Sequence, residues 1–135
     1  MALGRGLSVS VLLDTHVFYW WVTDSPRLSP IHRALFEAPA QPVYVSAVTG
    51  WEIAIKVRLG KWSDAGQLLP DLSGLVVRSG LQPLDLTLAQ AELAGTLPLV
   101  HRDPFDRLLA AQAIELGIPI ATVDSNLAQL GCSVL

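Results

Sequence analysis

The sequence predicts an α/β domain with a mainly parallel central sheet. Short, nearly continuous apolar runs rich in β-branched residues recur along the chain, among them Val9–Leu13 and Ile118–Val123. Such runs are typical of strands that are buried on both faces, as in a parallel sheet. Segments with helical start and stop signals separate the runs, and strands that alternate with helices are characteristic of α/β architecture.

The first half of the chain is expected to contribute two strands and three helices. A helix over Thr15–Val22 follows the strand Val9–Leu13, and a second helix over Ser29–Glu37 opens with a serine cap and a proline at its first position. Prolines then interrupt the chain before a short strand over Val43–Ser46. The next helix covers Val48–Leu59 and ends at the glycine that follows it.

The second half of the chain is expected to continue this alternation. Its clearest element is a helix over Phe105–Leu116, with Asp103 at the cap, Pro104 at the first helical position and Gly117 just after the end. The other expected elements are helices over Gln67–Ser79 (despite Pro70) and Thr87–Leu97, a helical turn over Asn126–Leu130, and strands over Leu81–Leu84, Ile118–Val123 and Cys132–Leu135.

The length and the cysteine content indicate one cytoplasmic domain. A chain of 135 residues fits a single domain over residues 1–135, with residues 1–6 as a flexible tail. The single Cys132 excludes an internal disulfide and fits a reducing compartment. No apolar run approaches the roughly 18 residues of a membrane span, and the first apolar run ends on Asp14 without the cleavage site of a signal peptide.

The composition is unusually apolar, with 51% hydrophobic and 16% charged residues, whereas about 25% charged is typical. We expect part of this apolar surface to be buried against another chain, either a second copy or a dedicated partner. The formal net charge of −3 excludes a chain-wide cationic surface for nucleic acid. Binding to RNA or DNA would therefore require metal ions and a local basic patch.

Two aspartates directly follow predicted strands. Asp14 ends the VLLD segment and Asp124 ends the IATVD segment. In open α/β sheets, functional groups gather in the crevice at the carboxyl ends of the strands. Each aspartate also precedes a helical segment, so helix capping is the competing interpretation for either one alone. Two such residues in one small sheet favour a shared site.

Glu52 is a third candidate, because it falls on the apolar stripe that Val48, Ile55 and Leu59 form at helical spacing. A carboxylate on a buried helix face is unfavourable unless a partner compensates its charge. An ion pair with Lys56, four residues later, is one possible partner. Such a pair contributes only a few tenths of a kcal/mol at a surface, so a cation at the rim of the sheet explains a buried acid better.

The segment HRDPFDRLLAAQA supplies Asp103 and Asp106. Both positions suit the positive end of a helix dipole, which is the competing interpretation. In the functional interpretation, Asp106 reaches the shared crevice and Asp103 is a cap. Converging carboxylates repel by about 4 kcal/mol per pair at 4 Å, so they require a cation, and oxygen ligands favour Mg²⁺ or Mn²⁺. Zinc is disfavoured, because the sequence has no Cys or His pair at ligand spacing.

Two histidines and four tryptophans complete the candidates. His16 and His101 each adjoin a proposed ligand, and we expect them to contact substrate or to support the structure rather than to bind the metal. The tryptophans offer surfaces on which bases can stack, but packing in the core or at an interface is the favoured interpretation. They are Trp20, Trp21, Trp51 and Trp62.

With these residues in view, the chain resembles the PIN-domain family, and within it the VapC-like toxin ribonucleases of type II toxin–antitoxin systems. The resemblance rests on four blocks in order, which together extend from Val11 to Leu130: LLDTHVFYWW, VYVSAVTGWEIAIKVRLGKW, HRDPFDRLLAAQA and IATVDSNLAQL. It implies a three-layer α/β/α sandwich, an Mg²⁺- or Mn²⁺-dependent endoribonuclease that hydrolyses RNA phosphodiester bonds, a homodimer, and inhibition by a cognate VapB-like antitoxin.

The resemblance also assigns the site. It implies that Asp14, Glu52, Asp106 and Asp124 are the catalytic and metal-binding residues, with Asp103 as the competitor for the third role. Ser46 and Thr122 match small polar positions near the family's sites and are candidates for hydrogen bonds to the ligands. In the expected mechanism, one or two cations polarise the scissile phosphate and activate a water molecule.

Two alternatives remain open at the level of sequence. Phosphoryl transfer through an aspartyl intermediate would use Asp14 as the nucleophile, but the DTH sequence lacks the second aspartate of the haloacid-dehalogenase pattern, and this reaction leaves Glu52 unexplained. The other alternative is a PIN-fold module that binds RNA or protein without cleaving RNA. The RNA target and the number of metal ions are not specified by these motifs.

Overall fold

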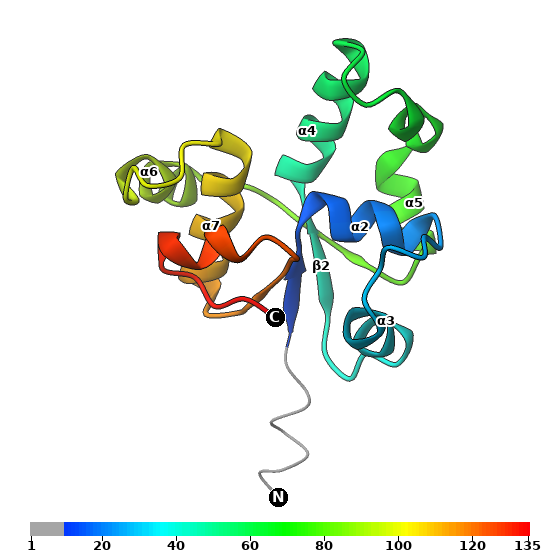
Figure 1. Cartoon of the computed structure of the whole chain (residues 1–135), viewed down its shortest axis with the longest axis horizontal. Helices are drawn as coiled ribbons and strands as arrows, with labels where there is room; N and C mark the ends of the chain where they lie inside the picture. Colours follow the sequence, from blue (N-terminus) through cyan, green and yellow to red (C-terminus); the bar gives the residue numbers. More distant parts are fainter. Residues whose placement is uncertain (1–9) are drawn as a thin grey trace, which may run out of the picture.

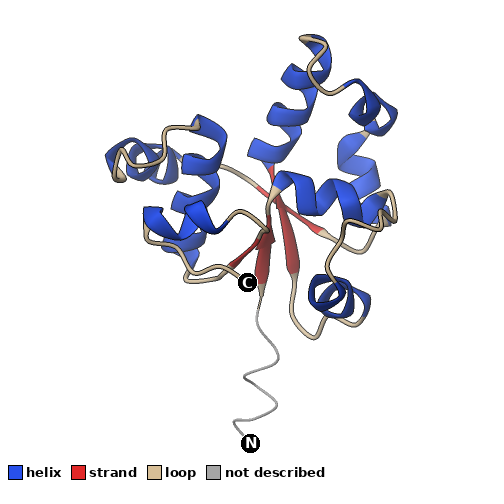
Figure 2. Ribbon diagram, viewed as in Figure 1, coloured by secondary structure: helices blue, strands red, loops and turns tan. Residues whose placement is uncertain are grey.

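A parallel sheet forms the centre of the computed structural model, which describes residues 10–135. Within that range the sheet has four strands in the order β3-β2-β1-β4, and all three pairings are parallel. The strands lie side by side between the helices in Figure 2. They are β1 (Val11–Leu13), β2 (Val43–Ser46), β3 (Gln82–Leu84) and β4 (Ile120–Ala121). The predicted α/β class with a mainly parallel sheet is confirmed.

The side chains of the central strands alternate between two separate cores. Val11 and Leu13 point into one apolar cluster, whereas Leu12 points into the other, and none of these side chains is exposed to solvent. A strand buried on both faces requires a layer of helices on each side. The two cores therefore correspond to the two helical layers of the α/β/α sandwich that the resemblance implied.

The helices divide between these layers (Figure 1). α2 and α3 lie on one side of the sheet and α6 and α7 on the other, while α4 extends from the carboxyl end of β2. The α-helices are α2 (Thr15–Val22), α3 (Pro30–Glu37), α4 (Ala47–Arg58), α5 (Leu72–Arg78), α6 (Leu88–Thr96) and α7 (Pro104–Leu116). Two 3₁₀ segments are η1 (Ser63–Leu68) and η2 (Ser125–Leu130). Among these described helices, none combines the length and apolar character needed to cross a membrane.

The prediction of one helix over Gln67–Ser79 is wrong. This segment is divided into the end of η1 and the separate helix α5, with an extended backbone at Leu69 and a bend at Pro70 between them. Proline lacks an amide hydrogen and sterically disfavours the helical conformation of the residue before it. The new helix starts after Asp71, whose carboxylate accepts a hydrogen bond from the Gly74 amide.

The strands at the C-terminal end are shorter than predicted. Ile118–Val123 is reduced to β4, and Cys132–Leu135 forms only an isolated parallel bridge between Val134 and Ile120. The length of strand pairing cannot be predicted from apolar runs, because such runs indicate which residues are buried and not which residues pair. The predicted start of the first strand at Val9 and the tail over residues 1–6 lie outside the described residues.

Candidate active site

The four predicted acids come together in one cleft of about 290 Å³. Asp14 follows β1 and Asp124 follows β4, while Glu52 and Asp106 come from α4 and α7. The chain passes from β1 to β2 and β3 on one side and returns to β4 on the other side of β1, so the cleft lies where the strand order reverses. The residues that line it are Asp14, His16, Trp20, Glu52, Lys56, Asp103, Asp106, Val123 and Asp124.

Asp14 lies at the base of the cleft and is only 8% exposed. It occupies the cap position of α2, but within the described chain its side chain makes no capping hydrogen bond. Its Oδ2 instead accepts a hydrogen bond of 2.6 Å from Thr122 Oγ1, as expected for Thr122. Burial raises the pKa of Asp14, and the Thr122 hydroxyl partly offsets this shift. The competing interpretation of Asp14 as a cap therefore fails.

Glu52 is 4% exposed, and hydroxyl and ammonium groups hold both of its oxygens. Thr15 Oγ1 donates to Oε1 at 2.6 Å, and Lys56 Nζ donates to Oε2 at 2.5 Å. The Lys56 pair that the sequence offered as an alternative is thus present. The predicted apolar stripe is partly wrong, because Leu59 is 58% exposed. The buried face of α4 consists of Val48, Thr49, Glu52 and Ile53.

Asp106, Asp124 and His101 form a group whose ligand atoms all lie within 4.8 Å of one another. His101 Nε2 is 2.8 Å from Asp106 Oδ2, and the two side chains are each 19% exposed. Burial raises the pKa of Asp106 to about 6, with the His101 hydrogen bond acting in the opposite direction. Asp14 and Glu52 line the same cleft but do not belong to this group among the described residues.

Two of the acids also cap helices. Asp103 Oδ1 accepts hydrogen bonds from the amides of Phe105 and Asp106, so its predicted capping role is confirmed, although it also lines the cleft. Asp124 Oδ1 accepts a hydrogen bond from the Asn126 amide at the start of η2. Capping and membership of the acidic cleft therefore coexist at Asp124, because a carboxylate has two oxygens and several acceptor positions.

The donor set in this cleft fits a hard divalent cation. Carboxylates from four different parts of the chain line one cavity. Among the described residues, Lys56 supplies the ammonium group in this lining, and it already forms an ion pair with Glu52. Burial raises the pKa values of Asp14 and Asp106, and a bound cation would act in the opposite direction by favouring the charged carboxylates. Asp106 and Asp124 with His101 have the spacing of a metal-binding group, and carboxylate oxygens favour Mg²⁺ or Mn²⁺.

Arg107 shapes the loop that carries His101. Its side chain is 8% exposed and does not belong to the lining of the acidic cleft. Its guanidinium donates hydrogen bonds to backbone carbonyls at 2.7 Å (Pro98), 2.9 Å (His101), 3.4 Å (Gly95) and 2.7 Å (Leu97). A buried guanidinium with several acceptors in place fixes this irregular segment where regular hydrogen bonding is missing. The sequence gives no signal for this role, because the four carbonyls become neighbours only in the folded chain.

The supporting polar residues are only partly those expected. The sequence did not indicate that Thr15, which directly follows Asp14, donates a hydrogen bond to Glu52. The Oγ1 atoms of Thr15 and Thr49 also lie 3.0 Å apart. Ser46 was expected near the ligands, but it caps α4 through the Val48 amide and donates to Gln112 Oε1. Its hydrogen bonds therefore support the junction of β2 with the helices and not the acids.

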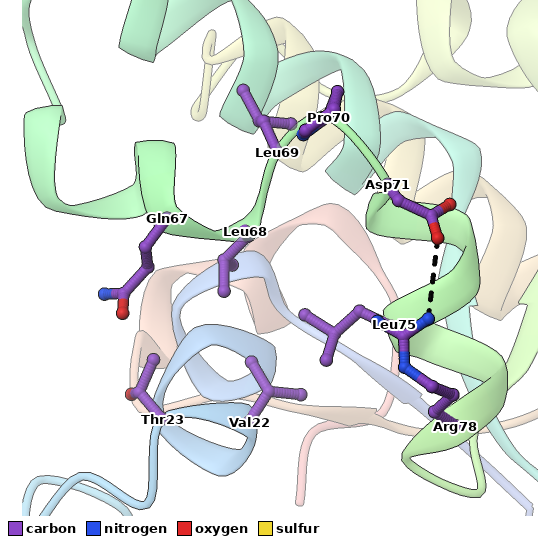
Figure 3. A pocket seen from close by; sticks show the side chains of 9 residues that line it. All are labelled: Val22, Thr23, Gln67, Leu68, Leu69, Pro70, Asp71, Leu75 and Arg78. Carbon is purple, nitrogen blue, oxygen red and sulfur yellow. Dashed lines mark hydrogen bonds and ion pairs between the residues drawn. The ribbon is translucent and has the colours of Figure 1, made fainter.

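A second hollow of about 330 Å³ lies between the end of α2, η1 and α5 (Figure 3). It combines apolar side chains such as Leu68 and Leu75 with an ion pair of 3.4 Å between Asp71 and Arg78. A single paired carboxylate cannot provide the ligand set of a divalent cation. The smaller, acidic cleft is therefore the candidate active site.

The fold and the acidic cleft at its switch point define a PIN-type domain, and the family comparison agrees. The model of the PIN domain family matches residues 11–131, so the chain belongs to this family. It is 34% identical over 120 residues to Ribonuclease VapC22 of Mycobacterium tuberculosis (strain ATCC 25618 / H37Rv), an alignment that covers 87% of this chain and 89% of the relative. The resemblance to the PIN and VapC proteins is confirmed.

Solved structures support the same fold. VapBC2 from Rickettsia felis, crystallised with a DNA fragment from its promoter, matches with a TM-score of 0.67 at 16% identity, over 93% of this chain and 96% of that chain. FitAcB from Neisseria gonorrhoeae matches with a TM-score of 0.61 at 20% identity, over the same shares of the two chains. VapC20 from Mycobacterium tuberculosis, described as a sarcin–ricin loop cleaving toxin, matches with a TM-score of 0.64 at 13% identity, over 93% of this chain and 98% of that chain.

Proposed function

We propose that this PIN domain is a metal-dependent endoribonuclease that acts as the toxin of a toxin–antitoxin pair. The observation that carries the proposal is the cleft itself: Asp14, Glu52, Asp106 and Asp124 are far apart in the sequence but line one cavity at the switch point of the sheet. The relationship to a VapC ribonuclease supports RNA as the substrate. Membership of the PIN domain family also supports Mg²⁺ or Mn²⁺ as the cofactor.

In this proposal, Asp14, Asp106 and Asp124 hold the cation from three sides of the cleft. When bound, Mg²⁺ or Mn²⁺ supplies Lewis-acid chemistry to the scissile phosphate and to the attacking water. His101 orients the Asp106 carboxylate through its 2.8 Å hydrogen bond, and Thr122 orients Asp14 in the same way. Such partners fix the orientation of metal ligands in many sites.

Glu52 completes the site from its edge. Because Thr15 and Lys56 occupy its two oxygens, we assign Glu52 a second task besides any contact with the cation or the attacking water. It holds the Lys56 ammonium at the wall of the cleft, where a positive charge attracts the phosphate backbone.

We further propose that a VapB-like antitoxin and a second copy of the chain cover part of the surface. Several large apolar side chains are strongly exposed, among them Leu88 (88%), Ile31 (74%), Leu99 (66%) and Val100 (66%). Leu99 and Val100 are adjacent in the chain, and large contiguous apolar patches mark sites that bind partner chains. The structural neighbours include VapBC2 and FitAB, each bound to a DNA fragment.

Cleavage of total cellular RNA by the purified chain tests the catalytic proposal. We expect cleavage with Mg²⁺ or Mn²⁺ and none with EDTA, and we expect Asp14→Asn to slow cleavage by at least about 100-fold. The matched control is Asp64→Asn, which makes the same change at an exposed position outside the cleft. Cleavage by Asp14→Asn at the parent rate would overturn the assignment. RNA binding by the parent without cleavage would instead favour the non-cleaving module.

A further inference from the structure

Aromatic side chains form one wall of the acidic cleft. His16 and Trp20, four residues apart on α2, both line the cavity. Trp62, in the turn between α4 and η1, stacks on His16 with ring centroids 4.7 Å apart and an angle of 22° between the planes. We propose that His16, Trp20 and Trp62 form a subsite that binds one unstacked nucleobase of the RNA beside the acids. The proposal rests on RNA as the ligand of the cleft.

The aromatic wall is a supported surface. Tyr19 contacts Trp62 with centroids 5.0 Å apart, and Trp62 packs against the apolar core. His16 lies between Trp62 and Trp20, whose ring is 6.0 Å away at an angle of 52°. Despite these contacts, His16 is exposed to solvent at the cleft.

The chemistry of the cleft explains why a base is the appropriate occupant. In the proposed function, the acids and their cation would bind the scissile phosphate. A domain with a net charge of −3 nevertheless gains little affinity from nonspecific attraction to the RNA backbone. Proteins that bind single-stranded RNA obtain affinity by stacking bases on aromatic side chains, and this contact tolerates many sequences. The wall beside the acids offers such a contact next to the phosphate to be cleaved.

Binding measurements test the subsite separately from cleavage. The probe is a labelled single-stranded decaribonucleotide, selected from a random pool by binding to the parent protein in Ca²⁺. A set of variants replaces each base in turn with an abasic ribose. We expect one abasic position to weaken binding to the parent by about tenfold. We also expect His16→Ala to weaken binding of the intact RNA by about tenfold, but to have little further effect on that abasic RNA.

Two more variants complete the experiment. Trp62→Leu keeps an apolar side chain on the core and removes the ring that supports His16, so it should reproduce the effect of His16→Ala. Trp51→Leu is the matched control, because Trp51 is 56% exposed on α4 and lies outside the lining of the cleft. If Trp62→Leu fails to fold, as judged by thermal melting, His16→Ala still provides the test, since His16 is exposed.

The outcomes separate the two proposals. Equal loss of affinity for intact and abasic RNA in His16→Ala, or equal binding of all abasic RNAs by the parent, would overturn the subsite. Position-specific binding through His16 without any cleavage in Mg²⁺ or Mn²⁺ would support the subsite and contradict the proposed catalysis. Failure of the parent to bind any RNA in the pool would overturn both.

Discussion

The cleft contains two pairs of acids that the protein treats differently. Asp14 and Glu52, which we call the inner pair, are almost fully buried, and Thr122, Thr15 and Lys56 hold their oxygens. Asp106 and Asp124, the outer pair, are partly exposed, and the partner described for Asp106 is His101, which carries charge only when protonated. Protein donors occupy both oxygens of Glu52 and one oxygen of Asp14, whereas the outer pair is more exposed to solvent.

This difference indicates a division of labour. Hydroxyl and ammonium donors fix the inner carboxylates before any ligand binds, so these acids define the geometry of the site. The outer carboxylates lie close to each other and to an imidazole, so their charges favour the arrival of a cation. We therefore expect changes to the outer pair to act mainly on metal binding, changes to Glu52 to act more on stability and on the position of the site, and changes to Asp14 to act on both.

The largest expected effect concerns metal affinity. Asp106→Asn should weaken Mn²⁺ binding by at least about 100-fold, because replacing even the hydrogen-bonding partners of metal ligands costs 10–100-fold. Glu52→Gln should weaken it by less than about tenfold, since both oxygens of Glu52 already have protein partners. Titration calorimetry on both variants measures this contrast. Equal losses at the two positions would contradict the division of labour.

The second prediction concerns the buried ion pair. Lys56→Met should lower the free energy of unfolding by about 2 kcal/mol, because it leaves the buried Glu52 carboxylate without its charged partner. The Lys56 side chain is 29% exposed, which reduces the loss below that of a fully buried pair. Adding Glu52→Gln should restore most of the stability, and urea denaturation of the single and double variants measures the coupling. Additive losses would show that the pair is not coupled.

The third prediction concerns the hydroxyl that holds Asp14. Thr122→Val should lower the free energy of unfolding by about 1–2 kcal/mol at pH 7, since hydrogen bonds to charged groups are stronger than neutral ones. It should also raise the pKa of Asp14 further, because the Thr122 hydroxyl opposes the effect of burial. Thr122→Ser retains the hydroxyl and is the matched control. A shift of the acidic limb of the pH–rate profile in Thr122→Ser as large as that in Thr122→Val would exclude this explanation.

The smallest effect is a dependence of stability on pH in EDTA. Burial raises the pKa of Asp106 from 3.8 to about 6, so its proton is bound more tightly in the folded state. This contribution to stability is complete below about pH 4 and is lost as the pH rises through about 6. We expect a difference of about 1 kcal/mol after solvent screening. Subtracting the profile of Asp106→Asn isolates it, and a difference of opposite sign would refute the cause.

The central strands and the four acids could be predicted from the sequence because burial on both faces leaves a direct signal. β1 is apolar without interruption, and Asp14 ends that run at the rim of the sheet. The break at Pro70 was misjudged, because the apolar spacing of η1 and α5 resembles one helix. Proline chemistry, which acts on the backbone alone, decided the outcome there.

The partners of the acids were harder to predict. Thr15 looks like an ordinary first residue of a helix, and its bond to Glu52 depends on how α2 crosses α4. The contact of His101 with Asp106 depends on the course of an irregular loop. Pairwise contacts between distant elements follow from tertiary packing, which leaves no periodic pattern in the chain. The acids that line the cleft were thus predictable from the sequence, whereas of their hydrogen-bonding partners only Thr122 and Lys56 were anticipated.

The hydrogen bonds from Arg107 to the backbone of residues 95–101 determine which positions of this loop can be substituted. The guanidinium binds only main-chain oxygens, so the exposed side chains of this loop can change without loss of the anchor. Leu99 and Val100, both 66% exposed, are therefore suitable positions for grafting new recognition sequences beside the cleft. Lysine could not replace the anchor, since an ammonium lacks the planar arrangement of donors that reaches several carbonyls at once.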